Sequence, residues 1–205
     1  MRRYSHILGS IAAAMIFSAT ACHAMTFGQV EQGRVIAFDK DKSEVTMIID
    51  SSLDAAKPVY DKLPPMVFKL PEDKGEIGAL PKAGQRMKLD TEKKVIVIYD
   101  TATKKIETLP INITDLQQPI DKEHPLVFDK AEKKAKPMPV IDKEKKTITI
   151  YSGRQKMLCT FSIPENYTDY PVSTWDAGDE VRVYYKTPGE SLRFMNVTRT
   201  DIYKK

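Results

Sequence analysis

One short pattern recurs along the chain and constrains its fold more than any other feature. An apolar residue is followed by aspartate, a charged turn and alternating apolar positions, most clearly in residues 89–99 (LDTEKKVIVIY). Residues 141–151 (IDKEKKTITIY) repeat the pattern at the same length, and residues 38–49 (FDKDKSEVTMII) repeat it with one extra turn residue. A charged turn between two alternating arms is typical of a β-hairpin. The sequence therefore predicts an all-β protein.

The order of these segments suggests an internal duplication. A hairpin, a single strand, a second hairpin and a closing strand are predicted first at residues 33–50, 66–70, 84–100 and 106–116. The same order recurs at residues 138–151, 158–163, 178–197 and 197–202. Four landmarks match in sequence: Asp39 with Asp142, Phe68 with Phe161, Ala83-Gly84 with Ala177-Gly178, and Thr114-Asp115 with Thr200-Asp201. Matches in one order indicate repeated units.

Each unit has only five or six short strands, and an open sheet of this size would leave its edges exposed. Closure into a small barrel removes these edges. The order of hairpin, strand, loop and hairpin favours an OB-like barrel, with an SH3-like barrel as the alternative. We therefore predict two tandem barrels, at residues 26–118 and 138–205, joined by a connection at residues 119–137.

The first 24 residues have the features of a secretory signal peptide: two arginines, an apolar stretch and small residues at the end. The apolar stretch is too short for a membrane-spanning helix. Cleavage after Ala24 would release a chain that begins at Met25. Alternatively, Ala19-Thr20-Ala21-Cys22 is a lipobox, residues 1–21 are the leader, and Cys22 carries the lipid of a bacterial lipoprotein. Both readings predict an exported, periplasmic protein.

Composition limits the chemistry of the mature chain. The chain has a formal net charge of +4, and two of its basic residues, Arg2 and Arg3, belong to the leader. Without these two arginines, the net positive charge of the chain is too small to indicate a nucleic-acid partner. The single histidine outside the leader region, His124, and the single internal cysteine, Cys159, cannot supply a zinc site or a catalytic triad. We expect no enzymatic activity, cofactor or metal.

The loop at residues 166–176 (NYTDYPVSTWD) is the one candidate ligand site. It carries Tyr167, Tyr170 and the only tryptophan, Trp175. Aromatic side chains on a loop of a rigid barrel can form a stacking platform for a glycan or a peptide. The competing interpretation is that Trp175 fills the end of the barrel as part of its core.

The overall layout resembles an uncharacterised, domain-of-unknown-function family of lipoproteins from sulfate-reducing bacteria. The resemblance rests on the leader with Cys22, on the chain length and on the paired segments like IDKEKKTITIY. It implies no activity. From the residues themselves we expect a non-catalytic envelope protein that acts as a protein-interaction or scaffold module on another envelope protein. The alternative is a periplasmic glycan- or peptide-binding module that uses the aromatic loop.

Overall fold

A computed structural model describes residues 27–54 and 57–200. The regular secondary structure of the described chain is almost entirely β-strand, so the predicted all-β class is confirmed. The leader, the lipidation candidate Cys22 and residues 201–205 lie outside the described residues. Within the described ranges, no helix combines the length and the apolar character that crossing a membrane requires.

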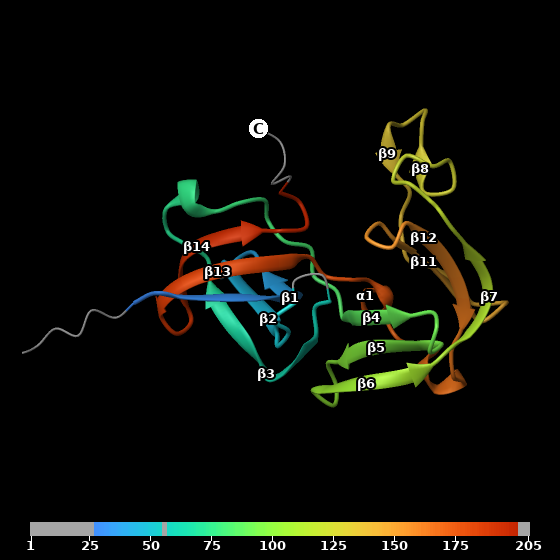
Figure 1. Cartoon of the computed structure of the whole chain (residues 1–205), viewed down its shortest axis with the longest axis horizontal. Helices are drawn as coiled ribbons and strands as arrows, with labels where there is room; N and C mark the ends of the chain where they lie inside the picture. Colours follow the sequence, from blue (N-terminus) through green and yellow to red (C-terminus); the bar gives the residue numbers. More distant parts are fainter. Residues whose placement is uncertain (1–26, 55–56, 201–205) are drawn as a thin grey trace, which may run out of the picture.

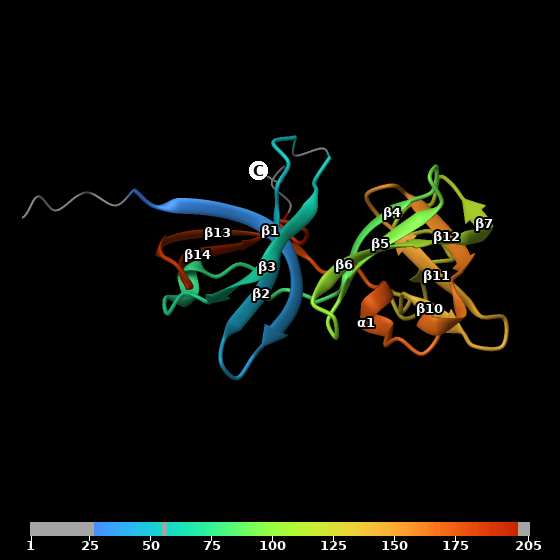
Figure 2. The ribbon, with the colours of Figure 1, turned by 90° about the horizontal axis from the view of Figure 1, so that it is seen from below.

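The strands form two lobes that lie side by side (Figures 1 and 2). The first lobe contains five strands from both ends of the described chain: β1 (Gln29–Asp39), β2 (Glu44–Asp50), β3 (Tyr60–Lys69), β13 (Glu180–Thr187) and β14 (Glu190–Asn196). The second lobe contains the strands between them: β4 (Arg86–Asp90), β5 (Val95–Asp100), β6 (Lys105–Pro110), β7 (Asn112–Gln117), β8 (Phe128–Asp129), β9 (Lys134–Ala135), β10 (Val140–Asp142), β11 (Thr147–Ser152) and β12 (Met157–Ser162). Helices are short: η1 (Lys74–Glu76), η2 (Glu165–Tyr167) and α1 (Val172–Trp175).

The five strands of the first lobe close on themselves in the order β1-β13-β14-β3-β2. All neighbours pair antiparallel except β14 and β3, which meet through the single parallel pair of Glu190 and Lys69. Alternation in each strand sends one set of side chains inward, where Val35, Met47, Phe68 and others form a buried core.

The second lobe packs two sheets face to face. The sheet β4-β5-β6 covers the sheet β10-β11-β12-β7, and a continuous apolar core lies between them that includes Ile98, Ile150, Phe161 and Trp175. The small pair β8-β9 projects from this lobe (Figure 1). It is held by a separate cluster that includes Ile120, Val127 and Leu158.

The repeated sequence pattern forms hairpins as predicted. β1-β2, β4-β5 and β10-β11 all pair antiparallel around the charged turns. In each turn the aspartate side chain accepts backbone N–H groups two or three residues later, for example Asp142 from Lys145 at 3.0 Å. The residue that ends each of these turns has a positive φ: Ser43, Lys94 and Lys146. This left-handed residue lets the chain reverse with the twist of the flanking strands.

The structure does not confirm the two tandem OB-like barrels. The hairpin β13-β14, assigned from sequence to a second barrel at residues 138–205, pairs with β1 and completes the first lobe. The second lobe is therefore inserted between the two parts of the first, and no boundary near residues 118–138 separates them. The predicted strand at residues 197–202 is also absent over its described part, which is a turn.

Apolar and polar contacts join the two lobes. Ile36, Ile48 and Tyr60 of the first lobe form one buried cluster with Met87 and Tyr99 of the second. Burial of large side chains from both sides is worth a few kcal/mol per fully buried residue. The lobes are therefore packed against each other and are not merely tethered.

Candidate functional site

The aromatic loop packs inward. Trp175 is fully buried, with 0% exposure, in the core of the second lobe. Tyr170 lies 6.5 Å from the Trp175 ring and 5.1 Å from the Tyr167 ring, measured between ring centroids. The Tyr167 hydroxyl donates to Glu107 of β6 at 2.8 Å. The loop therefore offers no stacking face of Trp175 to a ligand, and the core interpretation of this residue agrees with the structure.

The sulfur of Cys159 is also part of this core. Its side chain is 0% exposed, and burial raises the pKa of the thiol to about 11. A thiol that stays protonated and enclosed is a poor nucleophile and a poor metal ligand. Within the described ranges, no group of three or more His, Cys, Asp or Glu side chains is placed to hold a metal ion.

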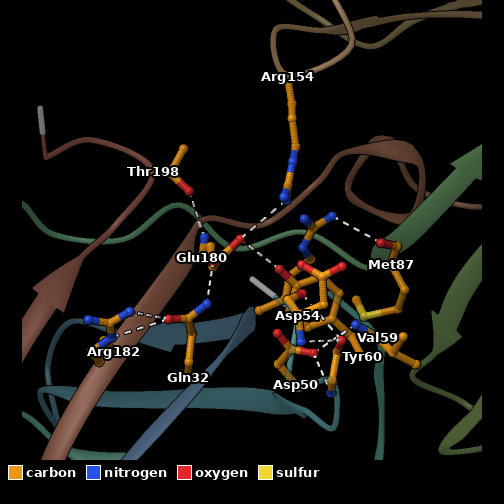
Figure 3. Close-up of polar contacts among 12 residues, drawn as sticks. Gln32, Asp50, Asp54, Val59, Tyr60, Met87, Arg154, Glu180, Arg182 and Thr198 are labelled. Atoms are coloured by element: carbon orange, nitrogen blue, oxygen red, sulfur yellow. Dashed lines mark hydrogen bonds and ion pairs between the residues drawn. The ribbon is translucent and has the colours of Figure 1, made fainter. Parts of the chain in front are cut away.

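A polar cluster on the first lobe, which we call the Glu180 cluster, reaches the second lobe through Arg154 (Figure 3). Glu180, at the start of β13, accepts hydrogen bonds from Tyr60 at 2.8 Å and from Gln32 at 2.5 Å. Gln32 in turn accepts from Arg182 at 2.7 Å. Arg154, from the β11-β12 turn of the second lobe, places a guanidinium nitrogen 3.9 Å from the same carboxylate.

Arg34 links this cluster to the second lobe. Its guanidinium lies 4.4 Å from the centroid of the Tyr60 ring. It also donates to the backbone carbonyls of Arg86 and Met87, each at 3.1 Å. Burial raises the pKa of the Tyr60 hydroxyl, the Arg34 charge opposes this shift, and the bond to Glu180 adds to it. Tyr60 therefore remains a proton donor to Glu180 at every physiological pH.

A second arginine is buried at the same junction. Arg86 is only 7% exposed, and its Nε donates to the backbone carbonyl of Trp175 at 2.9 Å. Burial, together with the nearby charge of Arg34, lowers the pKa of Arg86 to about 10. A charge buried in this way is costly unless it is fully bonded, so Arg86 ties α1 to β4 rather than serving as a free ligand group.

This arrangement fits a structural role better than a catalytic one. Both carboxylate oxygens of Glu180 are engaged by residues of the chain itself. Paired-acid hydrolysis needs a second acid across a cleft, and the partners of Glu180 are a tyrosine, a glutamine and an arginine. The Glu180 cluster therefore joins β1, β3 and β13 of the first lobe, and Arg154 connects it to the second lobe.

Sequence reasoning did not find this cluster. Tyr60 and Glu180 are separated by 120 positions, and Arg34 and Arg86 by 52. No local spacing signals such contacts, because they depend on which strands pair across the whole chain.

The edge strand β7 of the second lobe has no buried residue. It lies at one end of the sheet β10-β11-β12-β7, and within the described ranges only β12 pairs with it. Both views place it at the outer rim of the molecule (Figures 1 and 2). Four of its six residues are exposed, including Leu116 at 43%. Sequence analysis identified this segment only as a closing strand.

Comparisons with curated proteins and with solved structures gave no match. The sequence profile of one family matches residues 26–205, which is nearly the whole chain, and that family is described as a domain of unknown function, DUF4881. The resemblance to an uncharacterised family is thus borne out at the level of the domain, and the chain belongs to the DUF4881 family.

Proposed function

We propose that this protein is an exported, non-catalytic envelope protein whose second lobe binds another envelope protein. The observation that carries the proposal is the open edge of β7. An unpaired strand edge presents backbone N–H and C=O groups, and an extended segment of a partner can add a strand there. The leader at residues 1–24 supports export, and the lipobox around Cys22 supports a lipid anchor at the periplasmic face of a membrane.

Other edges of the same lobe are less suited to strand addition. β6, the outer strand of the sheet β4-β5-β6, carries Lys105 and Glu107 and ends at Pro110. β10 has only three residues and follows Pro139, which cannot donate a hydrogen bond. The edge of β4 is covered, because the backbone N–H of Arg86 donates to the carbonyl of Asp176. β7 has six residues with a single charge, Asp115, and no internal proline. Exposed edge strands of natural proteins are usually protected by charged residues or proline. β7 has one charged residue and no proline, which favours a partner at this edge.

The test places a photo-crosslinking amino acid at Leu116 of the full chain in its native cells. Val140 of β10 is the matched control, because its exposure of 48% is close to the 43% of Leu116. We expect a protein crosslink from position 116 that is absent from position 140. The substitution Leu116→Lys should weaken recovery of that partner about tenfold, whereas Val140→Lys should not. Equal crosslinking at both positions, or recovery unaffected by Leu116→Lys, would argue against the proposal.

The anchor is tested separately by the intact mass of the native mature protein. A mass that begins at Cys22 and includes acyl chains supports the lipoprotein, since several acyl chains exceed what stable anchoring requires. A bare chain that begins at Met25 in the soluble fraction would remove the anchor and leave the β7 interaction untouched.

A glycan- or peptide-binding role for the aromatic loop is the alternative. A hollow of about 100 Å³ does lie beside this loop, lined in part by Asp142, Lys146, Thr168 and Asp169. The hollow is smaller than the pockets that enclose most ligands, and Trp175 would have to leave the core to contribute. The β7 edge is therefore the better supported site.

A further inference from the structure

The outer face of the first lobe carries a groove that none of the preceding functions uses. It has a volume of about 540 Å³ and runs over β1, β13 and β14. Its apolar lining is Val30, Tyr184, Leu192 and Met195, and its charged lining is Glu76, Arg182 and Arg193. Val30 and Leu192 are 57% and 46% exposed. Exposed aliphatic side chains gathered in one place usually mark a contact surface.

The N-terminal end of the described chain lies against this groove. Val30 pairs with Tyr184 across β1 and β13. The backbone of Gly28 lies so close to the Tyr184 ring that a Cβ atom on Gly28 would approach a ring carbon to 2.1 Å. Phe27, which comes just before, is 87% exposed. β1 begins at the end of the first lobe that is far from the second lobe (Figures 1 and 2).

The length of the preceding segment limits where this face can lie. Cys22 and Gly28 are separated by 28 − 22 = 6 residue steps, and an extended chain spans at most about 20 Å over that distance. If Cys22 is anchored in a membrane, as in the proposed function on which this inference rests, the groove must lie within that reach of the bilayer. The second lobe and β7 lie at the opposite end.

The chemistry of the groove fits the headgroup region of a bilayer. Aromatic and aliphatic side chains enter the boundary between headgroups and acyl chains, and arginines contact phosphate groups. Arg193 keeps a 65% exposed side chain while its Nε lies 2.5 Å from Glu76. Arg182 lines the groove and is exposed, and its guanidinium also donates to Gln32. We propose that this face of the first lobe rests on the phospholipid surface and holds the β7 edge away from it.

The test uses the full lipidated chain, reconstituted in vesicles of equal parts phosphatidylethanolamine and phosphatidylglycerol. An environment-sensitive fluorophore is attached at Leu192→Cys or, as a second site, at Val30→Cys. Leu116→Cys is the matched control, because 43% exposure of Leu116 is close to 46% for Leu192. Cys159 is buried and does not compete for the label.

We expect the emission at position 192 to increase about threefold on reconstitution, because the fluorophore enters the apolar boundary, and to be quenched by lipids that carry a quencher. Position 116 should show neither effect. If the protein has an acylated mass but the fluorophores at positions 192 and 30 emit as in solvent, the anchor is supported and contact of the groove with the membrane is refuted. A mass without acyl chains would refute the anchor, and this inference with it. A protein crosslink from position 192 in cells would refute membrane contact and show that a protein partner covers the groove.

Discussion

The substitution Tyr60→Phe tests whether the Glu180 cluster stabilises the first lobe, because it breaks the side-chain bond between β3 and β13. It removes one hydroxyl that donates to a carboxylate at 2.8 Å and leaves the buried ring in place. A hydrogen bond to a charged group contributes about 1.5–3 kcal/mol net. Glu180 keeps its bond from Gln32, so we expect the lower part of this range, about 2 kcal/mol. For a chain of this size that corresponds to a fall in Tm of about 4–8 °C.

Urea unfolding followed by circular dichroism measures this loss, and Tyr185→Phe is the matched control. Tyr185 is equally buried in the first lobe, at 4% against 5% for Tyr60. Its hydroxyl donates to the neutral Gln29 side chain at 2.7 Å, and a neutral bond is worth about 1 kcal/mol. Tyr60→Phe should therefore cost about twice as much as Tyr185→Phe.

A double-mutant cycle with Glu180→Gln isolates the pair. We expect the cost of Tyr60→Phe to fall by about 1 kcal/mol when Glu180 has lost its charge, because coupled neighbours are not additive. If Tyr60→Phe is as stable as the unmodified protein, or if the two changes are additive, the bond between Tyr60 and Glu180 does not stabilise the first lobe and the reasoning fails.

Four other properties can be checked in solution. Burial raises the pKa of the Cys159 thiol to about 11, so Ellman's reagent should react only as fast as the protein unfolds; rapid reaction of the folded protein would contradict the enclosed core. Lys94 has a φ of 53°, so Lys94→Gly should raise the free energy of unfolding by about 0.5–1 kcal/mol and Lys94→Val should lower it. The backbone N–H of Lys145 lowers the pKa of Asp142; its stabilising effect is present above the unfolded value of about 4 and is lost as the pH falls through the lowered folded value, so Asp142→Asn should flatten the acid limb of stability against pH. Trp175 is fully buried, so its emission should be blue-shifted and unchanged by a glycan panel, and a saturable response would restore the aromatic loop as a binding site.

The hairpins could be predicted because their information is local. An aspartate that accepts the turn N–H groups and a run of alternating apolar residues both lie within about a dozen positions. The three repeats fold as predicted for this reason, and their register follows from the turn. The core position of Trp175 was one of two interpretations, and the sequence could not choose between them, because the sheet that covers this residue is built from β4, β5 and β6, far away in the chain.

The pairing of hairpins could not be predicted, and the landmarks taken as signs of duplication show why. Ala83-Gly84 and Ala177-Gly178 do not open equivalent hairpins in two barrels. They belong to the two connections that run between the lobes, and these pair with each other at Gln85 and Ala177. Both glycines also lie against β1: the N–H of Gly84 donates to the Val35 carbonyl at 3.1 Å, and a Cβ on Gly178 would approach that oxygen to 1.8 Å.

A shared packing requirement therefore explains the recurrence of Ala-Gly without a duplication. Two segments that cross one strand at close range both need a residue without a side chain. The same crossing explains why the chain ends meet in one lobe. Because Gly178 lies on Val35, the hairpin β13-β14 that follows it extends the sheet beside β1. The backbone N–H of Val35 donates to the Asp179 carbonyl at 3.0 Å, just before β13 begins. The contact that contradicts the tandem prediction thus also brings β13 beside β1 and places Glu180 within hydrogen-bond distance of Tyr60.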